Sequence, residues 1–208
     1  MKHIGIVACT AEGASLCYRT ICHSGDHPQV SIHTHSLAEY MRCIDRDDWG
    51  GVGALMLSSA DKLKAAGAEF LICPDNTIHY ALHFVGMPLP FLHIAEVVLA
   101  ASSYRRLGLL GTRYLVESDV YPADCVRPDA EERIEVNRII FEELVYGDFR
   151  PSSIGYLQSV IERLKAQGCD AVILGCTELP LVLNDGNSPL PVLDSTRLLA
   201  RAALEYAT

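Results

Sequence analysis

Short apolar runs alternate with amphipathic stretches along the chain. Four runs are apolar at nearly every position, namely IGIVA, FLIC, LGLLG and AVILG. Such runs are typical of strands buried on both faces of a parallel sheet. Helical patterns lie between them, and two of these end at Gly67 and Gly168, residues suited to helix C-termini. The alternation predicts an α/β fold with parallel sheets and right-handed crossovers.

Two further helices are predicted from their periodicity. Segment 131–147 is amphipathic, and its buried side is expected to carry Ile134, Ile139, Ile140 and Leu144. The acidic residues that open it, DAEER, are interpreted as a solvated first turn. The last helix, STRLLARAALEYA, is expected to pack on the first half of the chain.

The chain also contains an internal duplication. Three blocks recur in one order, two at an offset of 101 residues and one at 103: 58–77 with 159–178, 88–92 with 189–193, and 3–10 with 106–113. The repeats predict two pseudo-symmetric parallel-sheet α/β halves with the active site in the cleft between them. The expected boundaries are 1–100 plus the C-terminal helix 196–208 for the first half and 104–195 for the second.

Composition excludes several classes of function. The net charge of −9 and the absence of a basic run argue against a nucleic-acid partner. No apolar stretch is long enough to span a membrane, and the apolar start gives way to polar TAEG without a signal-peptide cleavage pattern. We therefore expect a soluble, cytoplasmic protein.

The eight cysteines admit two interpretations, a disulfide scaffold or reduced thiols. Several lie inside apolar runs, where cysteine behaves as a small hydrophobic residue, so reduced thiols are favoured. No Cys-x-x-Cys pair occurs, and His33-Thr34-His35 lacks a second half, so no metal site is predicted.

Ligands of parallel sheets bind beyond the carboxyl ends of the strands. The duplication relates Asp75 to Cys176 at two such ends, so a pseudo-dyad would bring them to opposite walls of one cleft. Moving a proton on or off a carbon needs a base on one face of that carbon and, for inversion, an acid on the other. A thiol suits this because its reference pKa is about 8.5. A helix N-terminus after each strand end would favour the thiolate.

Three motifs resemble the aspartate/glutamate racemase superfamily: GIVACTAEGA near the start, PDNTIH at 74–79 and LGCTELP at 174–180. The superfamily includes amino-acid and hydantoin racemases, maleate isomerases and arylmalonate decarboxylases. The resemblance implies an enzyme that needs no cofactor, acts on a small carboxylate or amino acid and forms a homodimer. It implies a catalytic Cys176 and, as substrate-binding residues, Thr10, Asn76, Thr77, Thr112, Thr177 and Glu178.

The chain departs from the superfamily pattern in two places. Asp75 stands where the racemases carry their first catalytic cysteine, so Asp75 and Cys176 become the expected acid/base pair. In the turn 146–149, where members often carry a basic substrate contact, this chain has Asp148. Arg150 could substitute; otherwise a second acidic group on the substrate is not expected.

Each residue also has a structural interpretation. Cys176 could be a buried structural cysteine, and Asp75 could cap the following helix. Asn76 and Thr77 could be ordinary helix-start residues, and Glu178 a first-turn acid. His79 could pack inside its helix or orient the site, and Cys9 lies close enough to the expected cleft to contribute.

Three functions remain open from the sequence. The leading hypothesis is an amino-acid racemase-like isomerase in which Cys176 and Asp75 exchange protons with the α-carbon. The second is one-sided chemistry by Cys176 alone, either decarboxylation or cis–trans isomerisation. The third is an inactive protein that binds small carboxylates.

Overall fold

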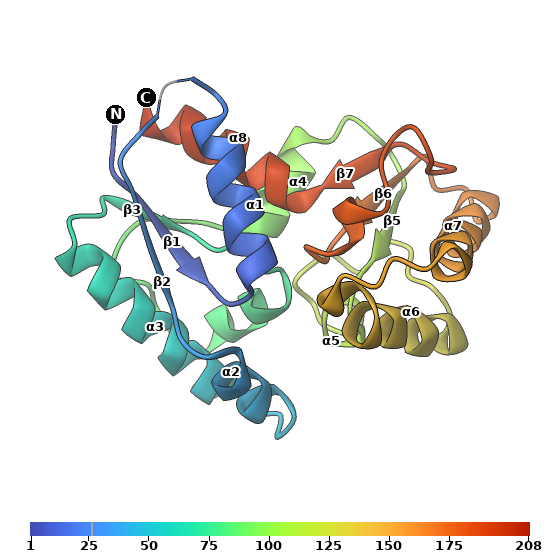
Figure 1. Ribbon diagram of the computed structural model, residues 1–208, viewed down its shortest axis with the longest axis horizontal. Coiled ribbons are helices and arrows are strands. Elements are labelled where there is room, and N and C mark those ends of the chain that lie inside the picture. The colour runs from blue at the N-terminus through green and yellow to red at the C-terminus, as the bar shows by residue number, and fades with distance from the viewer. Residues whose placement is uncertain (26) are drawn as a thin grey trace. The chain divides into compact units, whose positions relative to one another are not determined.

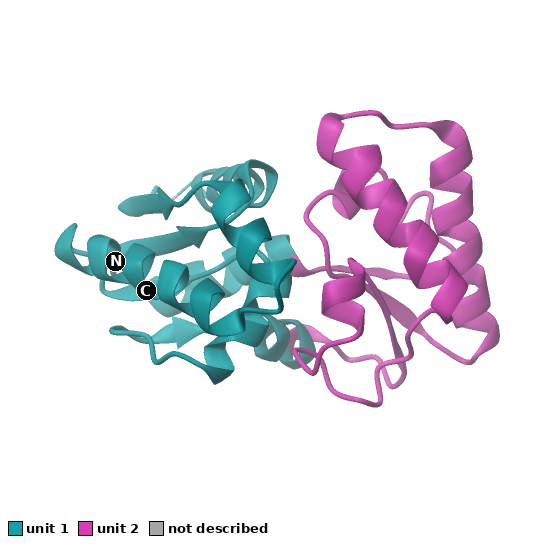
Figure 2. Ribbon diagram, turned by 90° about the horizontal axis from the view of Figure 1, so that it is seen from below, with its two compact units in different colours: residues 1–100, 196–208 teal, residues 101–195 magenta. Residues whose placement is uncertain are grey.

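The computed structural model describes residues 1–25 and 27–208 of the 208-residue chain (Figure 1). These residues form two compact units, coloured separately in Figure 2. Unit 1 comprises residues 1–100 and 196–208, and unit 2 comprises residues 101–195.

Unit 1 is built on a four-stranded parallel sheet in the order β2-β1-β3-β4. Its strands are β1 (Ile4–Ala8), β2 (Val30–Thr34), β3 (Phe70–Ile72) and β4 (Phe91–Leu92). Its helices are α1 (Ala11–Cys22), α2 (Leu37–Ile44), α3 (Trp49–Ala65), the 3₁₀ helix η1 (Thr77–His83), α4 (Ile94–Ala101) and α8 (Ser195–Ala207). Helix α8 contributes Leu199 and Ala203 to the core that contains Ile4 and Ile6 of β1.

Unit 2 is built on a three-stranded parallel sheet in the order β5-β6-β7. Its strands are β5 (Leu107–Leu110), β6 (Ala171–Leu174) and β7 (Val192–Asp194). Its helices are α5 (Arg113–Val116), α6 (Ala130–Glu142), η2 (Leu144–Tyr146), α7 (Pro151–Ala166) and η3 (Leu179–Leu181). Across both units, no helix of the described residues combines the length and hydropathy needed to cross a membrane.

Strand pairing follows the duplication in the sequence. Leu71 pairs with Phe91 in unit 1, and the residues 101 positions later, Val172 and Val192, pair in unit 2. Likewise, Gly5 pairs with Leu71, and the equivalent Gly108 pairs with Val172. The repeated blocks therefore occupy the same register in the two sheets. The predicted α/β class with two parallel sheets is confirmed.

Equivalent glycines end the helices that precede β3 and β6. Gly67 has φ of 96° and Gly168 has φ of 91°, left-handed values that favour glycine because it lacks a Cβ atom. In each turn the next residue closes the helix end: Ala68 N donates to Leu63 O at 3.0 Å and Cys169 N donates to Leu164 O at 3.1 Å. The predicted C-terminal caps are confirmed.

The prediction for segment 131–147 was partly wrong. Helix α6 ends at Glu142, and Ile134 is 63% exposed. Ile139, Ile140 and Leu144 are buried as expected, and Val136 takes the buried position expected for Ile134. The acidic first turn is not simply solvated either. Glu132 is buried because its carboxylate completes a capping box with Asp129 and pairs with Arg163.

The close approach of β5 to the residue after β6 gives a stability prediction. Gly175 N donates to Leu110 O at 2.7 Å, and a Cβ atom at Gly175 would overlap the buried side chain of Leu115. Gly175→Ala should lower the free energy of unfolding by about 1–3 kcal/mol, measured by urea denaturation, because the packed neighbours must shift. Gly155→Ala on the exposed face of α7, where nothing lies within 4 Å of the added atom, should stabilise the protein slightly. Equal effects of the two variants would contradict this account.

Candidate active site

Three strand ends of unit 2 meet at one edge of its sheet. Leu174 pairs with Leu110 on one side and with Asp194 on the other. Thr112 and Cys176 each lie two residues beyond this paired level, and Asp194 lies on it. Because parallel strands end in the same direction, these three residues share the carboxyl edge of the sheet.

The thiol of Cys176 is hydrogen-bonded to a buried carboxylate. Its Sγ donates to Oε2 of Glu178 at 2.9 Å, and Thr177 Oγ1 donates to the same oxygen at 2.8 Å. Cys176 is 9% exposed, and Thr177 and Glu178 are each 4% exposed. The three consecutive residues form one polar unit, in which a carboxylate oxygen lies ready to accept the thiol proton.

The segment after Cys176 differs from the helix that was predicted there. The segment that follows is η3, a 3₁₀ helix of three residues that begins at Leu179. So short a helix has little aligned dipole to offer a thiolate. The electrostatics of Cys176 therefore depend on its side-chain partners.

Thr112 and Arg150 occupy different parts of unit 2. Thr112 is buried and caps α5, with its hydroxyl accepting from Leu115 N at 3.3 Å. Arg150 is the N-cap residue of α7 and lies in the turn between η2 and α7. Its Nε donates to Asp148 Oδ2 at 2.7 Å, so the side chain that was expected to contact the substrate already has a carboxylate partner.

The corresponding edge of unit 1 carries the other predicted residues. Ile6 of β1 pairs with Ile72 of β3, so Cys9 and Thr10 follow one strand end and Asp75 and Asn76 follow its neighbour. Cys9 and Asn76 are buried, whereas Thr10 is half-buried and caps α1 by accepting from Gly13 N at 3.2 Å.

Asp75 lies at the start of η1, where it makes a capping contact. Its Oδ1 accepts from Ile78 N at 3.4 Å, and the residue is half-buried. Thr77, the first residue of η1, is also half-buried. Asp75 thus has the structural role that the sequence left open, and one edge of the carboxylate is engaged by backbone.

His79 fastens the Asp75 loop to the end of β3. Its Nε2 lies 2.9 Å from Cys73 O, and the ring packs edge-on against His93 with 4.6 Å between centroids. Burial, together with His93, lowers the pKa of His79 to about 3, while the hydrogen bond to Cys73 opposes that shift. His79 is therefore a neutral residue that donates one proton to a backbone carbonyl.

Two residues near these strand ends were not singled out from the sequence. Tyr40 of α2 is fully buried; desolvation raises the pKa of its hydroxyl, and Cys73, Cys9 and Asp75 add to that increase. Asp194 ends β7 beside Leu174. The signal for Asp194 was its place directly after the repeated block 189–193, whereas Tyr40 reaches its position only through tertiary packing.

The described residues form neither a disulfide nor a cluster of metal ligands. None of the eight cysteines forms a disulfide within the described residues. No three histidine, cysteine, aspartate or glutamate side chains gather there in a group that could hold a metal ion.

Known proteins resemble the chain over nearly its full length. The family model described as Asp/Glu/Hydantoin racemase matches residues 8–203. The broad specificity amino-acid racemase RacX of Bacillus subtilis is 25% identical over 189 residues, which cover 86% of this chain and 82% of RacX. A putative Asp/Glu racemase from Yersinia pestis is 32% identical with a TM-score of 0.88, covering 100% of this chain and 99% of that one. PH1733, an aspartate racemase homologue from Pyrococcus horikoshii, is 28% identical with a TM-score of 0.81 and the same coverage.

The pKa of His79 gives a prediction for the pH dependence of stability. Unfolding raises this pKa from about 3 to its ordinary 6.5, so the unfolded chain binds a proton that the folded chain does not. The stabilisation is complete above pH 6.5 and is lost as the pH falls towards 3, with a slope of up to about 1.4 kcal/mol per pH unit. Urea denaturation across this range should show a shallower slope for His79→Gln than for the wild type. The exposed His23→Gln serves as control, and identical slopes for wild type and His79→Gln would refute the assignment.

Proposed function

Because the chain belongs to the Asp/Glu/Hydantoin racemase family, we propose that it moves a proton at the α-carbon of an amino acid or similar small carboxylate. The observation that carries this proposal is the hydrogen bond from Cys176 to Glu178 at the carboxyl edge of unit 2. A buried thiol next to a buried carboxylate is a proton-transfer pair, and its position beyond a parallel strand is where such sheets bind ligands.

The proton moves in two linked steps on the side of Cys176. Glu178 accepts the thiol proton through Oε2, and the resulting thiolate removes the proton from the α-carbon. The electron pair stays on that carbon beside the substrate carboxylate. Hydrogen-bond donors stabilise the charge that develops there, and in this proposal Thr112, Thr177, Asn76, Thr77 and Thr10 hold that carboxylate.

Asp75 serves the other face of the carbon in the racemase mechanism. It returns a proton to the carbanion after Cys176 has removed one, and the roles reverse for the opposite enantiomer. His79 holds the Asp75 loop in place, because its Nε2 is hydrogen-bonded to the carbonyl of Cys73, two residues before Asp75. Racemisation through an unlike pair needs no cofactor, since each group both donates and accepts a proton.

A second candidate function is one-sided chemistry in which only Cys176 transfers the proton. The observation in its favour is the difference between the two units. Cys176 is paired with a side-chain carboxylate, whereas Asp75 accepts a hydrogen bond from the backbone N–H of Ile78 in η1. Decarboxylation or cis–trans isomerisation would need only the thiol.

Replacement of the thiol tests the core of the proposal. Cys176→Ala should abolish exchange of the substrate α-proton with solvent deuterium, a loss of at least about 100-fold, because it removes the transferring group. Mass detection of label in a panel of D- and L-amino acids measures the exchange. Cys169→Ala removes a similarly buried thiol at the opposite end of β6 and should leave exchange intact. Undiminished exchange in Cys176→Ala would eliminate the role of Cys176.

Asp75→Asn distinguishes the two candidate functions. In the racemase mechanism this variant should still exchange the α-proton of one enantiomer but should lose interconversion by about 100-fold or more, because the second face has no proton carrier. Chiral chromatography measures interconversion, and deuterium uptake measures exchange in the same samples. Full racemase activity in Asp75→Asn would assign the chemistry to Cys176 without Asp75.

A further inference from the structure

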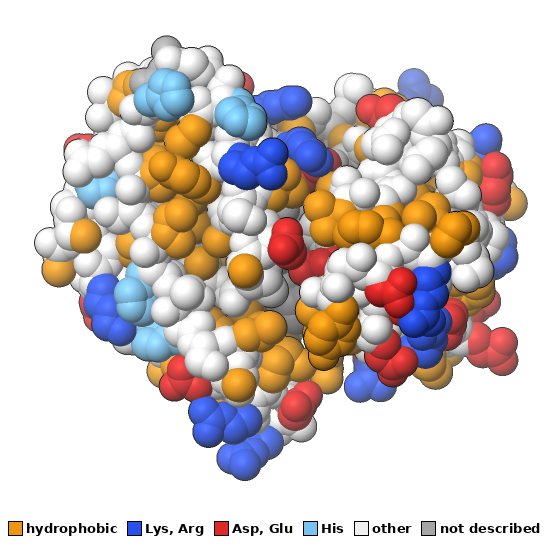
Figure 3. All heavy atoms as spheres, in the orientation of Figure 1, with side chains coloured by type: hydrophobic (Ala, Val, Ile, Leu, Met, Phe, Trp, Pro, Cys, Tyr) orange, Lys and Arg blue, Asp and Glu red, His pale blue; other side chains and the backbone are white. Residues whose placement is uncertain are grey.

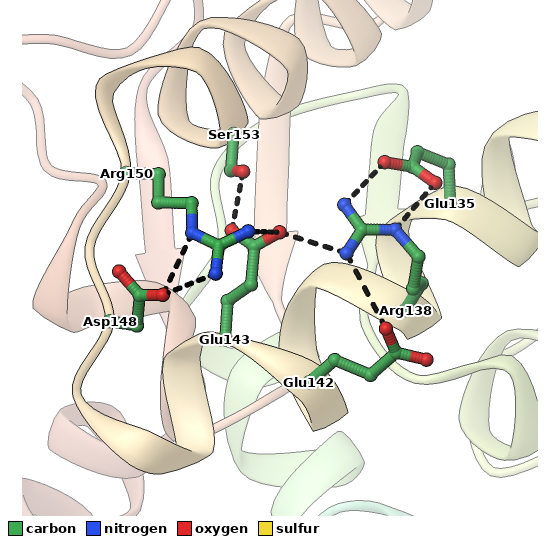
Figure 4. A network of polar contacts seen from close by, with 7 residues as sticks. All are labelled: Glu135, Arg138, Glu142, Glu143, Asp148, Arg150 and Ser153. Atoms are coloured by element: carbon green, nitrogen blue, oxygen red, sulfur yellow. Dashed lines mark hydrogen bonds and ion pairs between the residues drawn. The ribbon is translucent and has the colours of Figure 1, made fainter.

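A buried carboxylate binds both arginines at the end of α6 and the start of α7. Glu143 is 1% exposed; its Oε1 lies 2.8 Å from Arg138 Nη1 and 3.4 Å from Arg150 Nη1. Ser153 Oγ donates to its second oxygen at 2.5 Å. Figure 4 shows these contacts together with those of the surrounding acids. The Glu143 network consists of Glu135, Arg138, Glu142, Glu143, Asp148, Arg150 and Ser153.

Arg150 has more negative charge around it than it can neutralise. Its Nε and Nη2 lie 2.7 and 2.6 Å from one oxygen of Asp148, and its Nη1 faces Glu143. Asp148 and Glu143 raise the pKa of Arg150, and Ser153 and the arginines lower the pKa of Glu143. Moving Arg150 towards a ligand would leave the buried Glu143 with one cation fewer, which is costly for a desolvated charge.

This turn lies at the same edge of the sheet as Cys176. Helix α7 leads into β6 through a short turn in which Asp170 binds the backbone N–H groups of Arg105 and Arg106, just before β5. The C-terminus of α7 is therefore at the amino edge of the sheet, and its N-terminus is directed to the carboxyl edge. Leu144 of η2 and Cys176 are both buried in the hydrophobic core of unit 2.

The other guanidinium beside a strand end of unit 2 also has an acidic neighbour. Arg113 follows Thr112, and its Nε lies 3.8 Å from Glu117. On the visible face of unit 2, basic side chains are flanked by acidic ones (Figure 3). A second carboxylate on a substrate would therefore meet carboxylates as well as paired cations, and like charges placed together weaken binding.

The same turn exposes apolar side chains. Val145, Tyr146 and Phe149 are 38%, 79% and 45% exposed. The two residues between Tyr146 and Phe149 are Gly147 and the charged Asp148. Exposed aromatic and aliphatic groups beside a neutralised arginine favour contact with an uncharged group.

We propose that the Glu143 network restricts the substrate to amino acids with uncharged side chains, and that Asp148 is the specificity-determining residue because it occupies Arg150. The inference rests on the proposed function and names the substrate class of that site. Arg150 thus does not bind a second carboxylate in the wild-type protein. Removing the charge of Asp148 while keeping its shape would free Nε and Nη2 of Arg150 for a ligand while Nη1 keeps its contact with Glu143.

Equilibrium binding tests the inference independently of turnover. Calorimetry on the full-length protein would compare alanine, leucine and methionine with aspartate and glutamate, both enantiomers of each. The wild type should bind the neutral set more tightly. Asp148→Asn should raise the ratio of acidic to neutral affinity by about tenfold, since one opposing charge is removed and one guanidinium freed.

Two further variants make the result specific. Glu142→Gln removes an exposed carboxylate that contacts Arg138 at 3.6 Å but not Arg150, and it should leave the ratio unchanged. Asp148→Asn combined with Arg150→Gln should lose the gain, because the freed cation is no longer present. A gain that persists in the double variant would overturn the role of Arg150.

Binding and α-proton exchange together distinguish a failure of the inference from a failure of the proposed function. Wild-type protein that binds aspartate or glutamate as tightly as neutral amino acids overturns the inference, whatever the exchange assay shows. Selective binding of neutral amino acids without α-proton exchange overturns the proposed function and supports the inference. Absence of binding to every amino acid in the panel overturns both.

Discussion

The pairing of Leu174 with Leu110 and with Asp194 determines where chemistry can take place in unit 2. Parallel strands held in that register must release their chains at one edge, so Thr112, Cys176 and Asp194 are brought together although they are distant in sequence. Gly175 permits this arrangement, because any side chain there would collide with Leu115. The hydrogen bond of Cys176 with Glu178 depends on the backbone conformation that Gly175 allows just before them.

The two units repeat a scaffold but not its chemistry. Equivalent strands pair in equivalent registers, and equivalent glycines end the helices before β3 and β6. Beyond the strands the units differ: a thiol bonded to a carboxylate follows β6, and a carboxylate that caps a 3₁₀ helix follows β3. In this member of the racemase family, the equivalent strand ends of the two units therefore carry different functional groups, a thiol and a carboxylate.

Much of the fold could be predicted because buried parallel strands leave a plain signal. Strands β1, β3, β5 and β6 are apolar at every position, since both faces are covered. Strand β2 was not predicted because it is an edge strand with Ile32 exposed, and its sequence VSIHT alternates apolar and polar residues where the other strands are continuously apolar. Ile134 was misplaced because hydrophobicity alone does not distinguish the buried stripe of α6 from an isolated exposed residue.

The candidate site was predictable to the level of motifs. Cys176, Thr177 and Glu178 could be named from their sequence, but the shared oxygen that binds the thiol and the hydroxyl depends on side-chain rotamers. Arg150 was considered as a cation for the substrate, and only its contacts with Asp148 and Glu143 in the structure show that its charge is already paired. Tyr40 left no local signal, because folding alone brings α2 beside the end of β3.

Helix α8 makes the core of unit 1 discontinuous in sequence. Leu199 and Ala203 pack with Ile4 and Ile6, whereas unit 2 is a single uninterrupted segment between them. During translation, which proceeds from the N-terminus, unit 2 can be complete while β1 still lacks the helix that covers it. Strand β1 is therefore synthesised before unit 2 but is fully buried only after α8 has left the ribosome.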